Sequence, residues 1–218
     1  MDRLKVNFGG WLEAGFGLYR HNFGTLVFAS LLAILLSAAT FGILAGPMLA
    51  GMLLITLGLL DEKDPKPGVG CLFKGFNYFL NAFLFVLIWG VLIFVAVFVV
   101  SHVPFFGQLG SLFIFHAAQA LLLFAPFLIV DRQMAFWPAS LESISRVRTN
   151  FWPFLGLSIV SSIIGSLGAL ACGIGAAVTA PIQVCILTAA YRDVFGDGKN
   201  PEGMGLPASL KSQTHDGP

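Results

Sequence analysis

Two polar side chains lie well inside a long apolar segment, at a spacing that places them on one face of a helix. They are His116 and Gln119 in the segment 109–130, and side chains three residues apart are neighbours on a helix surface. Polar groups this deep in an apolar segment often mark a binding site, so the pair is a candidate ligand site. An interhelical hydrogen bond that only joins two helices also explains both residues, and we favour that interpretation.

A further histidine, His102, begins the short connection that precedes the segment of His116. We expect the two rings to approach each other across this connection. Two histidines without a nearby carboxylate or cysteine make a poor metal site, so we expect no metal and no cofactor. The apolar segments also lack the paired carboxylates, the serine–histidine arrangement and the phosphate-binding glycine loop that catalysis would need. The sequence therefore predicts a protein that is not an enzyme.

Two charged pairs end apolar segments. Asp131-Arg132 follows the segment of His116, and Arg192-Asp193 follows the last apolar segment. One hypothesis places these four residues at a cytoplasmic mouth or at the contact with a partner. The alternative, which we favour, is that they anchor helix ends at a membrane surface.

Long apolar helices must position all of these groups. The chain is 57% hydrophobic and 11% charged, whereas about a quarter of the residues of a soluble domain are charged. Six segments without Asp, Glu, Lys or Arg come close to the ~20 residues that a membrane-spanning helix needs. These segments are 23–40, 44–60, 81–101, 109–130, 151–170 and 174–191. The net charge of +1 offers no basic surface for nucleic acid, so we expect the lipid bilayer as the partner.

The charged residues alternate between the connections. Segments 40–43, 102–108 and 171–173 contain no Asp, Glu, Lys or Arg, and the 12 Lys and Arg residues all lie in the termini and the other two connections. Short, positively charged loops stay in the cytoplasm. Both termini are therefore predicted to be cytoplasmic, and the protein to be a multi-pass protein of the cell inner (plasma) membrane.

Three similar modules, approximately 7–61, 68–131 and 134–195, divide the chain. Each begins with a short amphipathic stretch typical of a helix in the headgroup layer, continues through an apolar hairpin, and ends near an acid. Asparagine is a favoured N-cap, and one stands at each turn into a hairpin: Asn22, Asn81 and Asn150. The pattern favours a triplicated unit, although the topology alone also forces charges into these positions.

Short motifs resemble uncharacterised bacterial multi-pass membrane proteins: FGILAGPM at 41–48, NFWPFLG at 150–156 and AYRDVFG at 190–196. The layout of most of residues 7–196 resembles the YciC-like inner-membrane proteins and the membrane domain attached to some glycerophosphodiester phosphodiesterases. The resemblance implies a bacterial inner membrane and brings no functional residues, because the catalytic phosphodiesterase domain is absent from this sequence.

The predicted fold is an all-α bundle of six transmembrane helices, arranged as three hairpins that each follow a cytoplasmic interfacial helix. It forms one domain, 1–197, with a flexible cytoplasmic tail at 198–218. The leading functional prediction is a non-enzymatic bundle that binds or passes a neutral small molecule or a lipid, as a homo-oligomer or with a partner in a membrane complex. The alternative is a membrane scaffold or accessory subunit that docks a cytoplasmic partner.

Overall fold

The computed structural model describes residues 7–104, 107–168 and 174–196, and every regular element in these ranges is a helix. The predicted all-α class is thus confirmed for the described part of the chain. The predicted tail at 198–218 lies outside the described residues. In chain order the elements are α1 (Phe8–His21), α2 (Phe23–Ala39), α3 (Ala45–Leu60), η1 (Val69–Tyr78), α4 (Phe79–Ser101), α5 (Gly107–Leu121), α6 (Ala125–Asp131), α7 (Phe136–Thr149), α8 (Phe151–Leu167) and α9 (Ile174–Phe195).

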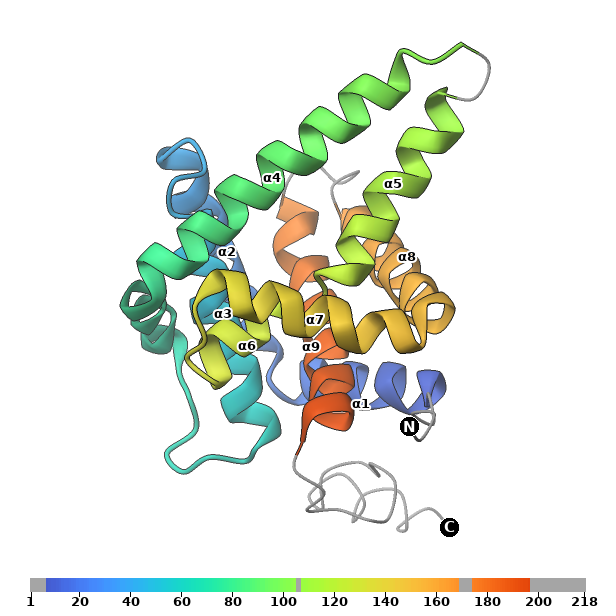
Figure 1. Cartoon of the computed structure of the whole chain (residues 1–218). Helices are drawn as coiled ribbons and strands as arrows, with labels where there is room; N and C mark the ends of the chain where they lie inside the picture. Colours follow the sequence, from blue (N-terminus) through green and yellow to red (C-terminus); the bar gives the residue numbers. More distant parts are fainter. Residues whose placement is uncertain (1–6, 105–106, 169–173, 197–218) are drawn as a thin grey trace.

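The apolar helices pair as three hairpins. They are α2–α3, α4 with the broken helix α5–α6, and α8–α9, and the short helices α1, η1 and α7 precede them. In Figure 1 the joined ends of all three hairpins point to one end of the molecule, and the charged loop between α3 and η1 lies at the other. The chain turns by 90° between α1 and α2. The charged residues of the described chain therefore gather at one end of the bundle.

The helices differ in length more than the sequence predicts. The run 69–101, which joins η1 to α4, and the run 107–131 of α5 and α6 are long and apolar enough to cross a membrane, and the bent pair α1–α2 would make a third span. Helices α2 and α8 have 17 residues and α3 has 16. At 1.5 Å per residue they reach about 25 Å, against a hydrocarbon core of about 30 Å. By length and composition, the described helices give two or three spans instead of the six predicted.

The break between α5 and α6 has a local cause. Pro126 has no backbone N–H and its ring clashes with the carbonyl four residues earlier, which favours a break in the helix at this point. The Ser143 side chain of α7 replaces lost backbone bonds, because its hydroxyl donates to the Leu121 carbonyl at 2.8 Å and accepts from the Phe124 N–H at 3.2 Å. The broken helix thereby becomes a docking point for α7.

The packing of the modules follows a cyclic order. Each short helix packs on the last helix of the neighbouring module: η1 on α3, α7 on α6, and α1 on α9. The first helix of each hairpin follows the same rule, because α4 packs on α3, α8 on α5, and α2 on α9. The first and last modules therefore meet, and the ring closes between the two ends of the chain.

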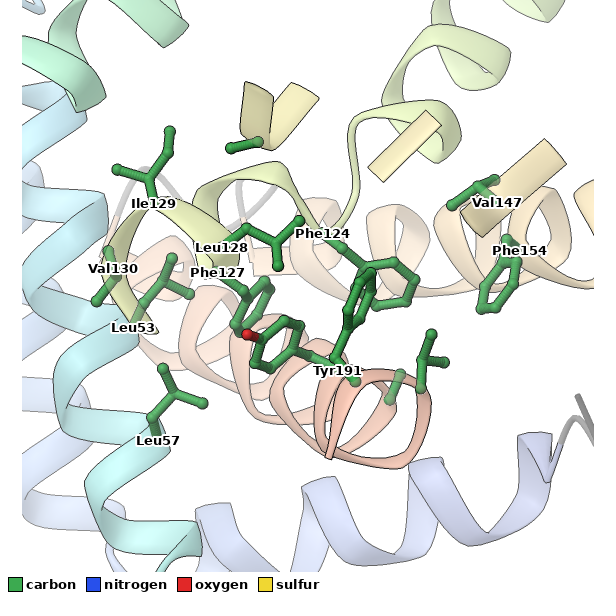
Figure 2. Packing of buried hydrophobic residues seen from close by; sticks show 14 of the residues in the cluster. Leu53, Leu57, Phe124, Phe127, Leu128, Ile129, Val130, Val147, Phe154 and Tyr191 are labelled. Carbon is green, nitrogen blue, oxygen red and sulfur yellow. The ribbon is translucent and has the colours of Figure 1, made fainter. Parts of the chain in front are cut away.

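Aromatic rings fill the centre of this arrangement. Phe127 stacks on Tyr191 with their centroids 4.9 Å apart, and Phe124 meets Tyr191 at 6.2 Å and Phe154 at 5.4 Å. Trp11 of α1 continues the series by stacking on Phe154 at 6.0 Å. All five side chains are fully buried or nearly so, and Figure 2 shows four of them between the helices. The core thus joins α1, α6, α8 and α9 at the charged end of the bundle.

Candidate functional site

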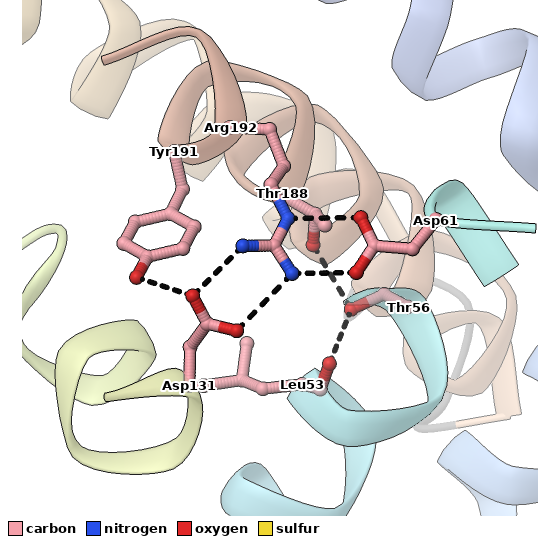
Figure 3. Close-up of polar contacts among 7 residues, drawn as sticks. All are labelled: Leu53, Thr56, Asp61, Asp131, Thr188, Tyr191 and Arg192. Carbon is pink, nitrogen blue, oxygen red and sulfur yellow. Dashed lines mark hydrogen bonds and ion pairs between the residues drawn. The ribbon is translucent and has the colours of Figure 1, made fainter. Parts of the chain in front are cut away.

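The strongest polar arrangement in the described chain surrounds Arg192, near the C-terminal end of α9. Its Nε and Nη2 donate to the Asp61 carboxylate at 3.0 and 2.6 Å, and its Nη1 and Nη2 donate to the Asp131 carboxylate at 2.8 and 3.1 Å. Asp61 follows α3 and Asp131 ends α6 (Figure 3). One guanidinium therefore makes a bidentate contact with each of two carboxylates and joins the charged ends of all three hairpins.

Neighbouring hydroxyl groups extend this Arg192 cluster. The Tyr191 hydroxyl donates to Asp131 at 2.9 Å. One turn further into the bundle, the Thr188 hydroxyl donates to that of Thr56 at 2.9 Å, which joins α9 to α3 a second time. Figure 3 shows the two layers, with the ion pairs beside the threonine pair. The last helices of the first and third modules are thus fixed by polar contacts at two levels.

The Arg192 cluster is partly shielded from solvent. The side chains of Arg192, Asp131 and Asp61 are 22%, 25% and 29% exposed. Burial by itself would lower the pKa of the Arg192 guanidinium, but the hydrogen bonds to Asp131 and Asp61 outweigh it and the pKa is raised. The guanidinium therefore stays charged, and its donors are occupied within the chain.

The other two residues of the predicted mouth have different roles. Asp193 points to α1, where it accepts a hydrogen bond from Trp11 Nε1 at 2.8 Å. Arg132 donates to the Phe195 carbonyl at 3.0 Å, and its guanidinium lies 5.6 Å from the centroid of the Phe195 ring. The structure thus joins Asp131 and Arg192 directly, and gives Asp193 and Arg132 separate contacts within the bundle.

Sequence reasoning did not place Asp61, Tyr191 or Trp11 at this site. A signal for Asp61 existed, because an acid follows each of the three hairpins. Nothing in the sequence says that the hairpin ends converge, and that convergence is what brings Asp61 and Asp131 onto one guanidinium.

The three residues of the predicted histidine site, His102, His116 and Gln119, have separate surroundings in the structure. Gln119 Oε1 accepts a hydrogen bond from the Ser162 hydroxyl at 3.2 Å, which joins α5 to α8. His116 Nδ1 is buried without a hydrogen-bond partner in the described chain. His102 caps the end of α4, with Nδ1 2.8 Å from the Phe98 carbonyl and its ring against the Phe98 ring. Among the described residues, no hydrogen bond joins His102 to His116.

The three asparagines differ from the predicted N-caps. Asn22 and Asn150 occupy the N-cap positions of α2 and α8, but neither side chain accepts from the helix backbone. Asn22 instead donates back to the Leu18 carbonyl of α1 at 3.1 Å. Asn81 lies inside α4, and its side chain accepts from the Phe136 N–H at 3.4 Å. Asn150 Nδ2 is buried without a hydrogen-bond partner in the described chain. The N-cap position is thus confirmed for Asn22 and Asn150 and wrong for Asn81, and none of the three side chains makes the predicted capping hydrogen bond.

Two further features limit what the described residues can bind. In the ranges that the structure describes, no group of three or more His, Cys, Asp or Glu side chains is placed to hold a metal ion. A small apolar recess lies between α3, α4 and α6, and neither His116 nor Gln119 contributes to it. Its lining includes Gly46, Ala50, Ala82, Phe85, Pro126 and Ile129.

Comparisons of the chain with protein-family models, with curated proteins and with solved structures give no match. The resemblance to the YciC-like proteins therefore stays a prediction.

Proposed function

We propose that this chain is an integral protein of a cell inner membrane, in which the three hairpins cross the bilayer six times and both termini are cytoplasmic. Large apolar side chains on the outer surfaces of the hairpins support the proposal, because lipid would cover them. They include Phe28 and Leu35 of α2, Leu87, Phe94 and Phe98 of α4, Leu112 and Phe113 of α5, and Ile163 of α8. The shorter helices would cross where the bilayer thins around the protein, at a modest cost in free energy.

Within the membrane, we propose that the protein is a non-enzymatic scaffold or accessory subunit. The Arg192 cluster carries this proposal. A mouth or a docking site would present free charges, whereas the guanidinium and both carboxylates here bond to one another across the hairpin ends. The stacked rings of Phe127 and Tyr191 fill the space beside them. This geometry favours a rigid framework over a passage through the centre of the bundle.

The surface that best suits a partner of such a framework is the outer side of α4. The most apolar stretch of this helix has no buried residue, and Leu87, Val91, Phe94 and Phe98 are exposed at helical spacing along one side. The acidic ends of the hairpins suit a cytoplasmic partner less well, because contacts within the chain engage all three of these acids. We therefore propose a membrane-embedded partner, either another protein or a second copy.

Native mass spectrometry of the protein released from its own membranes tests this proposal. We expect a discrete assembly whose abundance falls in a Phe94→Ala/Phe98→Ala variant and stays unchanged in the control Phe28→Ala/Leu35→Ala. The control removes exposed apolar groups from α2 instead. A monomer in both variants and in the wild type would contradict the scaffold proposal.

A second candidate function is the binding of a neutral, hydrogen-bonding molecule beside His116. The buried, unpartnered Nδ1 atom favours it, because buried polar groups nearly always have a partner. The same mass spectra test this candidate. A stoichiometric small ligand that disappears in His116→Ala and persists in His102→Ala would support it, and an identical ligand content in both variants would count against it.

A further inference from the structure

Small residues bring the three short helices that precede the hairpins close to the bundle. A Cβ atom on Gly15 of α1 would lie 2.6 Å from the Cα atom of Ile186 in α9. A Cβ atom on Gly75 of η1 would meet the backbone of Pro47 and Gly51 in α3. In α7 the buried face contains Ala139, Ser140 and Ser143. Close backbone contact therefore fixes each helix on the bundle.

The same helices bury some large side chains, such as Trp11 of α1 and Leu72 of η1, and leave others exposed on a second side. Phe16 of α1 is 40% exposed and Phe73 of η1 is 48% exposed. In α7, Trp137 and Leu141 are 51% and 52% exposed, and their spacing of four residues puts them on one face. Each short helix thus has an outward apolar face in addition to the face that contacts the bundle.

In η1 the division into faces is the sharpest. A 3-10 helix has three residues per turn, so side chains three apart eclipse one another. Leu72 and Gly75 form the buried face. Phe73 and Phe76 stack with centroids 6.5 Å apart, and the series continues with Phe79 of α4 at 6.5 Å from Phe76. The aromatic series runs along the outside of the bundle.

Each of the three helices also carries an exposed cation. They are Arg20, Lys74 and Arg148. Arg20 follows Phe16 by four residues, and Arg148 follows Leu141 by seven, so both lie on the outward apolar face of their helix. Within residues 7–104, 107–168 and 174–196, none of the three forms an ion pair, whereas Arg192 and Arg146 both do. An apolar face edged by free cations is complementary to a phospholipid with an anionic headgroup.

We propose that α1, η1 and α7 form a lipid-binding collar, in which the outward apolar residues enter the acyl region and Arg20, Lys74 and Arg148 hold the phosphates of anionic phospholipids. The proposal rests on the membrane-embedded arrangement proposed above. The specific partner is then the anionic lipid of one leaflet, the leaflet at the charged end of the molecule, where Arg192 joins the hairpin ends. Glu13 of α1 is also exposed and precedes Phe16 by three residues, so it lies on the same side of α1 as Arg20. We expect its carboxylate to face water at the edge of the collar.

The first experiment measures lipid preference. The full-length protein is placed in nanodiscs of equal parts phosphatidylcholine and phosphatidylglycerol, and the lipids retained on release are counted by native mass spectrometry. Because each cation near an anionic surface contributes about 1 kcal/mol, Arg20→Gln/Arg148→Gln is expected to lower the preference for phosphatidylglycerol by roughly thirtyfold. The control Lys63→Gln/Lys66→Gln removes two exposed cations from the loop after α3, and it should keep the wild-type preference. An equal loss in both variants, or no preference in the wild type, would overturn the collar.

The second experiment separates the collar from the membrane embedding on which it rests. Quenching of tryptophan fluorescence is measured with lipids brominated close to the headgroup or deep in the chain. We expect shallow bromine to quench the signal that Trp137→Phe removes, and deep bromine to quench a tryptophan introduced by Phe28→Trp on α2, outside the proposed partner surface of α4. If only the α2 tryptophan is quenched, the collar is wrong and the embedding stands. If neither is quenched, the embedding itself is wrong.

Discussion

Arg192 holds together three helix ends that are far apart in the sequence. Its carboxylate partners precede it by 131 and 61 residues, so the cluster exists only when the modules have assembled. Removing one residue of a partly buried ion pair is destabilising, because the remaining charge is left without a partner. Here the loss of Arg192 would leave two carboxylates close to each other.

We therefore expect Arg192→Gln to lower the free energy of unfolding by about 1–3 kcal/mol, between the values for exposed and for buried pairs. Thermal unfolding in one detergent measures this change. Arg148→Gln, which removes an exposed arginine without an ion pair, should unfold at nearly the wild-type temperature. Adding Asp131→Asn to Arg192→Gln should recover part of the loss, since it removes the repulsion. Equal unfolding temperatures for Arg192→Gln and the wild type would contradict this role.

Gln119 provides a smaller test at the same scale. Its hydrogen bond from Ser162 joins α5 to α8, and such bonds between membrane helices contribute about 0.6 kcal/mol on average. Gln119→Leu should therefore cost about this amount in the same unfolding assay. When Ser162→Ala is already present, Gln119→Leu should lower the free energy of unfolding by almost nothing further. Additive losses in the double variant would mean that the two side chains act independently.

At the scale of elements, the sequence predicts which helices exist better than it predicts their contacts. The amphipathic stretches before each hairpin are helical as expected. Their apolar faces were expected to lie in the headgroup layer. The structure divides the apolar residues of each helix between two sides. Trp11 and Leu72 are buried beside Gly15 and Gly75, whereas Phe16 and Phe73 are exposed. Hydrophobic periodicity cannot distinguish a face that meets lipid from a face that meets protein, because both are apolar.

The close approach of η1 to α3 can be tested with two glycines of the same helix. A side chain at Gly75 would meet the backbone of α3, whereas nothing lies within 4 Å of a Cβ atom at Gly70. Forcing extra atoms into a packed contact typically costs about 1–3 kcal/mol. We expect Gly75→Leu to lower the unfolding temperature in detergent and Gly70→Leu to leave it nearly unchanged. Because leucine is a better helix former than glycine, similar losses for both variants would show that the contact with α3 does not set the cost.

At the scale of the whole molecule, the cyclic packing of the modules supports the triplicated unit that the sequence favours. Each short helix packs on the last helix of the neighbouring module. The contact of α1 with α9 is the third of these contacts, and it joins the first module to the last. This closure could not be read from the sequence, since it depends on contacts between the two ends of the chain. The charge pattern did predict which helix ends share one side of the bundle.

A circular permutant tests the closed ring. If the natural ends are joined by a flexible linker and the chain is opened before Gly68, all three contacts between short and long helices are retained. We expect this permutant to unfold within about 4 °C of the wild type, the shift that roughly 1 kcal/mol produces in a chain of this size. Opening the chain at Gly42, in the turn between α2 and α3, should prevent folding, because it places charged ends at the uncharged end of the bundle. If the permutant opened before Gly68 fails to fold, the account of a closed ring is wrong.

The central claim is that three hairpins cross the bilayer six times, and site-directed cysteine labelling tests it most directly. Single cysteines replace the exposed residues Phe41, Val103 and Ser166 near the joined hairpin ends, and Lys63 and Ser145 at the charged end. The native cysteines are changed to alanine, and a membrane-impermeant maleimide is added to intact cells and to inverted vesicles. We predict that the first three positions react only in intact cells, and the other two only in inverted vesicles. If Phe41 or Ser166 reacts from the same side as Lys63 while Val103 reacts from the opposite side, only the long helices α4 and α5–α6 span the membrane, and the six-span account is wrong.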